Sequence, residues 1–148
     1  GMPGPDAGGV QGLSARFVVP VEGGGPIRVT PGPDLDRLAD GALDVLTRGE
    51  WSIDPRSDRT GTRLVGSVLA HREGARAMTT PMIEGAIECP PGSAPIVLGA
   101  EHPTTGGYPV VAVVARVDLA RFHRIPLGRP VRFRVISYAE ARAAARVR

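Results

Sequence analysis

The longest regular pattern of apolar residues in this sequence has the spacing of a helix. Six apolar positions recur at intervals of three and four residues and share one helical face: Leu35, Leu38, Ala39, Ala42, Leu43 and Leu46. Asp34, at the end of the turn sequence PGPD, is suited to cap the start, and Gly49 is suited to end it. The pattern predicts one amphipathic helix over 35–49 that covers a core.

The remaining apolar segments are short and predict strands. They are separated by turn-forming clusters such as DPRSDRTG and PPGSAP and lie at 27–30, 50–53, 62–66, 83–88, 95–99, 108–117 and 129–137. In the last segment Val131, Phe133 and Val135 alternate with arginines, so one face is expected to be buried. The run VVAVV at 110–114 is apolar on both faces and predicts a central strand.

A helical turn over 118–123 and a terminal helix over 138–148 complete the expected elements. Many strands with two or three helices predict a mainly β domain, most simply a barrel that leaves few edges open. Residues 1–25 are rich in Gly and Pro and predict a flexible leader. One domain over 26–148 is therefore expected.

Composition excludes several classes of protein. The sequence contains no apolar run of about 18 residues and no signal-like start, so we expect no membrane span, no export and a cytoplasmic location. The single cysteine, Cys89, rules out an internal disulfide and a cysteine-based metal cage. Beside Pro90-Pro91 it is expected to be a small buried apolar residue.

All 18 basic residues are arginines, and nine of them lie in residues 116–148, which hold only two acidic residues. Such asymmetry is one signature of a nucleic-acid-binding surface. Here the arginines are spread over a predicted strand and a predicted helix, and few aromatic residues accompany them. We therefore expect no nucleic-acid partner.

The connection EHPTTGG at 101–107 is longer than a tight hairpin requires. Its glycine pair allows close approach of a backbone or a ligand, and neighbouring hydroxyl groups and His102 can donate or accept hydrogen bonds. The segment is either a pocket-forming loop or an ordinary turn. The residues alone leave both interpretations open.

A second candidate lies in SDRTGTRLVG at 57–66. Arg59 and Arg63 can direct a guanidinium at a carboxylate substrate, or they can pair with Asp54 or Asp58 at the surface. Glu84, Glu88, Glu101 and His102 match no known metal-ligand spacing, so no metal site is predicted. No nucleophile elbow, P-loop or dinucleotide motif is present, and the catalytic residues are unknown.

Taken together, three segments resemble the C-terminal half of the allophanate hydrolase subunit 2 family. These are IRVTPGPDLDRL, WSIDPRSDRTGTRLVG and the long run from GAIECPPGSAPIVLG through AEHPTTGGYPVV to RFRVIS. The family is also described as the 5-oxoprolinase subunit designated C and as a biotin-dependent carboxyltransferase-type domain. The similarity runs in order from about Ile27 to the C-terminus.

The resemblance implies a cyclophilin-like β-barrel that acts with a subunit 1 type partner in an ATP-linked amide hydrolase. No cofactor is expected on this chain itself, and ATP is expected only at the level of the complex. The alternative is a non-catalytic regulatory or protein-binding module with a degraded site. Carried over by position, the residues expected to bind a small amide substrate are Arg59, Gly61, Arg63, Glu88, His102, Thr105, Gly106, Gly107 and Tyr108.

The sequence departs from the family pattern at three points. Thr79-Thr80-Pro81 stands where the family has Ser-Glu-Gly, and Glu88 stands where it has glutamine. Gly1 before Met2 indicates the remnant of a cleaved tag, so Met2 is taken as the natural start, and the family's N-terminal half would then be missing. A barrel without that half is expected to cover its exposed surface as a homo- or hetero-oligomer.

Overall fold

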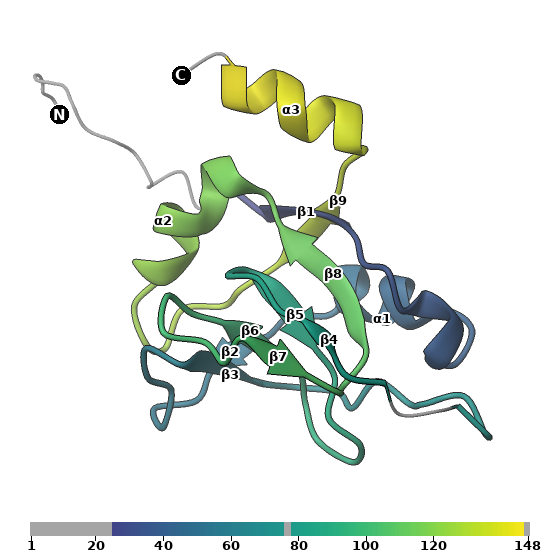
Figure 1. The fold of residues 1–148 in the computed structure, drawn as a ribbon. Coiled ribbons are helices and arrows are strands. Elements are labelled where there is room, and N and C mark those ends of the chain that lie inside the picture. Colours follow the sequence, from purple (N-terminus) through teal and green to yellow (C-terminus); the bar gives the residue numbers. More distant parts are fainter. Residues whose placement is uncertain (1–24, 76–77, 147–148) are drawn as a thin grey trace, which may run out of the picture.

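The computed structural model describes residues 25–75 and 78–146. Most strands belong to one seven-stranded sheet in the order β2-β3-β6-β5-β8-β1-β9, shown in Figure 1. Its strands are β1 (Ile27–Pro31), β2 (Ser52–Ile53), β3 (Gly61–Val65), β5 (Ala86–Glu88), β6 (Ile96–Leu98), β8 (Val110–Val114) and β9 (Phe133–Val135). A separate two-stranded ribbon pairs β4 (Thr80–Pro81) with β7 (Thr105–Gly106). The predicted mainly β, barrel-like fold is confirmed.

The sheet curls until its two edges meet. Trp51, just before β2, and Val131, two residues before β9, form an isolated antiparallel bridge. The Trp51 amide donates to the Val131 carbonyl at 2.9 Å, and the Val131 amide donates to the Trp51 carbonyl at 2.7 Å. Because β2 and β9 are the outermost strands, this single bridge closes the barrel.

The core fills the inside of this curled sheet. β8 lies between β5 and β1, as its apolar sequence predicted, and Val111 and Ala112 are fully buried. The helix α1 (Ala42–Arg48) contributes Leu46, and α2 (Leu119–His123) contributes Phe122 to the same cluster. The indole of Trp51 is 2% exposed, and its Nε1 donates to the Leu46 carbonyl at 2.9 Å. Trp51 therefore links α1 to the point where the barrel closes, since its indole binds the Leu46 carbonyl and its backbone forms the closing bridge.

The single helix predicted over 35–49 is wrong, because the chain divides there into two helices. A 3-10 helix spans Leu35–Arg37, and α1 begins only after Gly41, whose φ is +84°. Between them Leu38 pairs with His71, and the Ala39 amide donates to the Ala70 carbonyl. Pairing with a distant segment replaces the helical hydrogen bonds that the periodicity predicted.

The apolar face of that segment is nevertheless buried at its key positions. Leu38 and Leu46 are fully buried, and Ala42 is 6% exposed. Asp34 does not cap the helix start through its side chain. Instead its Oδ2 accepts a hydrogen bond from the Val110 amide at 2.9 Å, which ties the segment to the central strand.

Near the C-terminal end, the predicted alternation holds for two of three residues. Val131 and Phe133 are buried, whereas Val135 is 37% exposed and Ile136 is buried in its place. The Ile136 amide donates to the Val29 carbonyl at 2.8 Å, so the chain turns inward after β9. The alternation in the sequence therefore predicted burial correctly for Val131 and Phe133 and wrongly for Val135.

The last helix, α3 (Tyr138–Arg146), lies at the top of Figure 1, where it contacts the 3-10 helix Arg116–Asp118, and none of its residues is buried. Its start is a capping box. The Glu140 amide donates to Ser137 Oγ at 3.0 Å, and the Ser137 amide donates to Glu140 Oε1 at 2.8 Å. The Tyr138 hydroxyl donates to the Pro31 carbonyl at 2.6 Å and attaches the helix to β1.

Two expectations concern parts of the chain that the structure covers only partly. The predicted leader, except for Gly25, lies outside the described residues. In the described residues no helix has the length and apolar character needed to cross a membrane.

Candidate functional site

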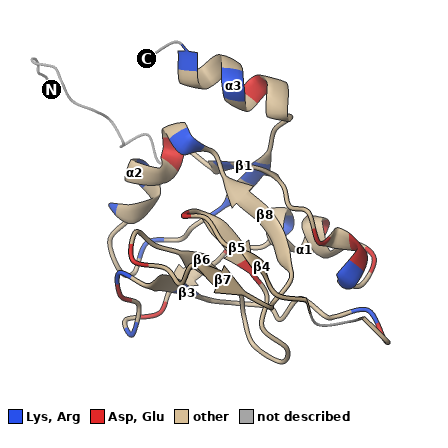
Figure 2. Cartoon of the chain, viewed as in Figure 1, with Lys and Arg blue, Asp and Glu red and all other residues tan. Residues whose placement is uncertain are grey.

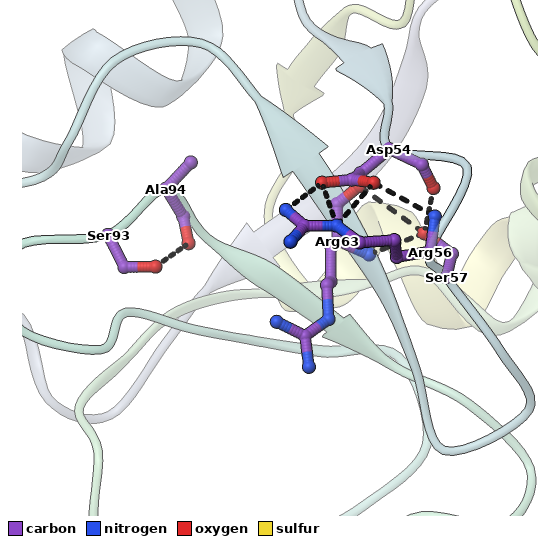
Figure 3. Close-up of polar contacts among 6 residues, drawn as sticks. All are labelled: Asp54, Arg56, Ser57, Arg63, Ser93 and Ala94. Atoms are coloured by element: carbon purple, nitrogen blue, oxygen red, sulfur yellow. Dashed lines mark hydrogen bonds and ion pairs between the residues drawn. The ribbon is translucent and has the colours of Figure 1, made fainter.

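The turn before β3 is held by its own side chains. The Asp54 carboxylate accepts from the Arg56 amide at 2.8 Å and from Arg56 Nη2 at 2.7 Å, as drawn in Figure 3. These hydrogen bonds lower the pKa of Asp54 to about 2. Ser57 Oγ donates to the Asp54 carbonyl at 2.7 Å and accepts from the Arg63 amide at 2.8 Å. The base of the turn is therefore fixed.

The tip of the same turn presents Arg59. Asp58 Oδ1 accepts from the amides of Thr60 at 2.9 Å and Gly61 at 3.3 Å, which folds the backbone tightly behind the tip. The Arg59 side chain is 82% exposed, and its Nη1 lies 3.5 Å from Glu101 Oε2. Such an exposed pair holds its guanidinium only weakly and leaves it able to contact a ligand.

The start of the 99–108 segment lies directly against this turn. The Gly99 amide donates to the Thr60 carbonyl at 3.0 Å, and the Glu101 amide donates to the Arg59 carbonyl at 3.0 Å. A Cβ at position 99 would collide with the Arg59 carbonyl oxygen, so the close approach requires glycine. Turn and loop, far apart in the sequence, therefore form one wall.

Beside this wall lies a hollow of ≈ 460 Å³ at the α2 end of the barrel. Its polar lining comes from Ser57, Asp58, Arg59, Thr62 and His123, and its apolar lining from Ile53, Phe122 and Ile125. Gly99 and Ala100 complete it. The volume and the mixture of apolar walls with a few polar groups are those of a small-molecule site. We call it the barrel-mouth hollow.

His123 in this hollow also contacts an acidic residue. Its Nε2 lies 3.4 Å from Glu84 Oε2, and both side chains are partly exposed. The fold places this histidine at the end of α2, beside the hollow. The sequence carried no signal for the Glu84 contact, because the two residues belong to unrelated segments.

The residues in and just before β3 that were predicted to bind substrate lie apart from one another. Arg59 lines the barrel-mouth hollow, whereas Arg63 lines a second hollow of ≈ 270 Å³ with Asp54, Arg56 and Ser93. In Figure 3 the Arg63 guanidinium extends away from the pair formed by Asp54 and Arg56. Gly61 is buried in β3, where a Cβ would press on the Ile96 side chain.

Glu88 and Arg63 lie on the same face of the sheet, because both are paired with Ile96 on the strand between them. Arg63 pairs with Ile96, and Ile96 pairs with Glu88 on the next strand. Directly paired residues face the same side, so Arg63 and Glu88 lie on one face with Ile96 between them. Burial raises the pKa of Glu88. This carboxyl is therefore more easily protonated than an exposed one.

The predicted residues of the 102–108 segment are not among the residues that line the barrel-mouth hollow. Thr105 and Gly106 form β7, and Gly106 packs against Met82. His102 Nδ1 lies 2.6 Å from the Pro103 carbonyl, and Tyr108 is 46% exposed. The contacts with the turn that carries Arg59 are made by Gly99 and Glu101, which precede these residues.

Gly107 is held by a residue that the sequence did not suggest. Arg37 Nη2 donates to the Gly107 carbonyl at 2.6 Å, and Arg37 Nη1 lies 3.9 Å from Asp34 Oδ1. The side chain of Arg37 is 11% exposed, and its Nε and Nη1 have no hydrogen-bond partner among the described residues. The contact joins segments 70 residues apart in the sequence, so no local pattern could predict it.

The geometry favours binding over covalent chemistry at this site. The described residues hold no group of three or more histidine, cysteine or acidic side chains that could bind a metal ion. The hydroxyl groups lining the hollow belong to Ser57 and Thr62, and Ser57 Oγ already serves the turn. The arrangement can orient a polar ligand through Arg59, Asp58 and Thr62.

The cysteine is equally unsuited to nucleophilic attack. Cys89 is 0% exposed, and burial together with the charge of Glu88 raises the pKa of its thiol to about 12. We expect iodoacetamide at about pH 8 to alkylate it in the folded protein on the order of a thousandfold more slowly than after unfolding in urea. Mass spectrometry of timed samples measures both rates. Equal rates would contradict the burial of this residue.

In a comparison with protein families, residues 5–135 match the family described as carboxyltransferase domain, subdomain A and B. The chain is 32% identical to the 5-oxoprolinase subunit designated C of Escherichia coli K12 over 129 residues, which are 87% of this chain and 42% of that protein. It is 31% identical to the corresponding 5-oxoprolinase subunit of Haemophilus influenzae over 115 residues, covering 78% and 37%. The chain thus spans less than half the length of these curated relatives.

A solved structure shows the same fold. The urea amidolyase of K. lactis superposes with a TM-score of 0.70 and 27% identity, over 79% of this chain and 8% of that one. Sequence and structure comparisons therefore agree on one type of domain.

Proposed function

This chain belongs to the family of the carboxyltransferase domain, subdomain A and B, and on that premise we propose that it is a component of an ATP-linked amide hydrolase. Within it the chain holds a small amide substrate together with a subunit 1 type partner, as in a 5-oxoprolinase or an allophanate hydrolase. Two relatives are named as one subunit of a 5-oxoprolinase, which supports a multi-subunit assembly. ATP acts at the level of that complex.

The observation that carries this proposal is the barrel-mouth hollow. An amide presents a carbonyl that accepts hydrogen bonds and, unless fully substituted, an N–H that donates one. Arg59 and Thr62 supply donors, and Asp58 and Thr62 supply acceptors, within one concavity. Ile53, Phe122 and Ile125 form the apolar part of the wall and exclude water from the bound ligand.

Arg59 gives the site its charge preference. Its partner Glu101 is 63% exposed, so the pair separates at little cost when a ligand carboxylate competes for the guanidinium. A planar guanidinium can bind such a carboxylate through two parallel hydrogen bonds. The site therefore suits a small amide that also carries a carboxylate, which both 5-oxoproline and allophanate do.

Replacement of Arg59 by glutamine tests this assignment. With a subunit 1 type partner, ATP and 5-oxoproline or allophanate, we expect Arg59→Gln to lower kcat/KM about tenfold or more, since a charge-assisted bidentate contact is lost. Product release is measured with the wild type and with Arg48→Gln, a control that removes an exposed arginine on α1. The control is expected to retain wild-type activity.

Two results count against the proposal. One is a complete lack of ATP-dependent turnover with every subunit 1 type partner supplied. The other is an equal effect of Arg59→Gln and Arg48→Gln, because the arginine in the hollow would then have no special role.

The alternative function is a non-catalytic binding module. It is favoured by the lining of the barrel-mouth hollow, which pairs no nucleophile with a base. This alternative predicts a stable complex with the partner and no turnover. Co-purification of the two proteins, followed by the same product assay, separates the two functions.

A further inference from the structure

A third hollow lies on the other side of Ile125, between α2, the connection to β9 and the start of β1. Its volume is ≈ 480 Å³. Four arginines line it, Arg121, Arg124, Arg129 and Arg132, over an apolar surface that includes Ile125, Pro126 and Val131. In Figure 2 blue segments lie on α2 and along the chain that follows it. We call this hollow the arginine groove.

Two of the four arginines are already engaged. Arg121 donates to the carbonyls of Gly25 and Pro26, each at 2.7 Å, and lies 3.3 Å from Asp118. Arg132 Nη2 lies 2.7 Å from Glu50 Oε2. Arg121 is therefore held in place at the wall of the groove, whereas Arg132 is held by an exposed ion pair.

The other two guanidinium groups are free in the described part of the chain. Neither Arg124 nor Arg129 has a side-chain hydrogen bond or ion pair with a described residue, and no acidic residue lines the groove. Two unpaired cations of the same sign near one concavity repel each other, and a bound anion relieves that repulsion. The charge of the groove therefore selects for a negative ligand.

We propose that the arginine groove binds a small organic anion, one that joins a carboxylate or phosphate group to an apolar body. The guanidinium fork of Arg124 or Arg129 matches either anionic group. The proline and isoleucine surface accommodates the apolar body, and the volume is that of a small-molecule site. The groove shares Ile125 with the barrel-mouth hollow and none of its polar residues.

Titration calorimetry at low ionic strength tests the proposal with four probes on the purified chain. Phenyl phosphate and benzoate carry both features, inorganic phosphate carries only the charge, and benzamide carries only the apolar ring. We expect phenyl phosphate or benzoate, or both, to bind at least about tenfold more tightly than inorganic phosphate and benzamide. The stronger of the two identifies the anionic group.

The double variant Arg124→Gln, Arg129→Gln is expected to weaken binding of the preferred anion about tenfold or more. The control, Arg48→Gln with Arg146→Gln, removes the same net charge from exposed positions elsewhere and is expected to bind as the wild type does. Thermal unfolding checks that both double variants are folded, which is expected because all four arginines are exposed.

The proposal is overturned if benzamide binds as tightly as the anions, or if both double variants lose affinity equally. The first result would remove the charge preference, and the second would reduce it to a general effect of net charge. A probe comparison on the wild type stands even if one variant fails to fold. Neither result bears on the barrel-mouth hollow, whose polar residues are unchanged in these experiments.

Discussion

Replacement of Trp51 by alanine is expected to lower the free energy of unfolding by about 3–5 kcal/mol. The indole is 2% exposed and packs closely against the backbone of Gly49 and Gly66, so its removal leaves a cavity that glycine cannot fill. The Leu46 carbonyl also loses its hydrogen bond from Nε1. The Trp51 backbone forms the bridge that closes the barrel, so the lost packing lies at the point of closure.

Urea unfolding followed by circular dichroism measures this change, since Trp51 is the only tryptophan and its fluorescence is lost in the variant. Trp51→Phe keeps most of the apolar area without the donor and is expected to lose less stability than Trp51→Ala. Val65→Ala, at a 49% exposed position of β3, is the control and is expected to change stability by less than about 0.5 kcal/mol. A Trp51→Ala variant as stable as this control would contradict the packing described.

Replacement of Asp118 by alanine is expected to cost about 2–4 kcal/mol. The carboxylate is buried, with 3% of its side chain exposed. It accepts hydrogen bonds from the Arg28 amide at 2.8 Å, from Arg28 Nη2 at 2.8 Å and from Arg121 Nη2 at 3.3 Å. Without it the Arg28 amide loses its partner, and two guanidinium groups lose their counter-charge. Both arginines retain some exposure to water, which limits the loss.

The effect of Asp118→Ala depends on pH in a definite direction. Burial alone would raise the pKa of Asp118, but the hydrogen bonds and charges of Arg28 and Arg121 outweigh it and hold the pKa below its ordinary value of 3.8. A carboxyl with a lowered pKa stabilises the folded state fully above that ordinary value and loses its contribution as pH falls through the lower folded value. The stability difference between wild type and variant is therefore expected to narrow below pH 3.8.

Chemical denaturation at several pH values measures this narrowing. Asp40→Ala provides the control, because the Asp40 side chain is 95% exposed and its 2.8 Å contact with Arg72 is a surface ion pair. Such pairs contribute about 0–1 kcal/mol, so little change is expected at any pH. A constant difference for Asp118→Ala across the acid range would show that its charge plays no part.

Local pattern was sufficient wherever the chain follows its own periodicity. The strand at 27–30, the central strand at 110–114 and the helix from 138 were all predicted, because alternation, a continuous apolar run and a helix-forming sequence are read within a few residues. The number of strands predicted a barrel, and the resemblance to a known family implied that it is cyclophilin-like. Its closure at Trp51 and Val131 joins segments that no local pattern relates.

The errors have a common cause, which is pairing between distant segments. Leu38 continues the helical spacing but pairs with His71, so the helix predicted there is broken. The β4 and β7 ribbon was not predicted, since Pro81 and Gly106 are of residue types depleted in strands and the two short segments gain their conformation from each other. Helix or strand propensity is a weak guide to the structure where hydrogen bonds between distant segments determine the backbone conformation.

The candidate site was predictable only in part for the same reason. Arg59 and the segment from 101 to 107 were both selected, and the fold joins the turn to the start of that segment at Glu101. Thr62, Phe122 and His123 became site residues only because the barrel brings α2 beside the turn. The Arg37 contact with Gly107 likewise depends on the whole fold.

The exposed position of α3 means that regions of the molecule resist opening to different degrees. A nine-residue helix is too short to persist in water by itself, and here it is held by its capping box, by one hydrogen bond to β1 and by contacts with the 3-10 helix Arg116–Asp118. Its amide protons should therefore exchange with deuterium after a small, local fluctuation, whereas those of β8 should exchange only when the entire barrel comes apart. The C-terminal helix is thus expected to open locally before the barrel unfolds.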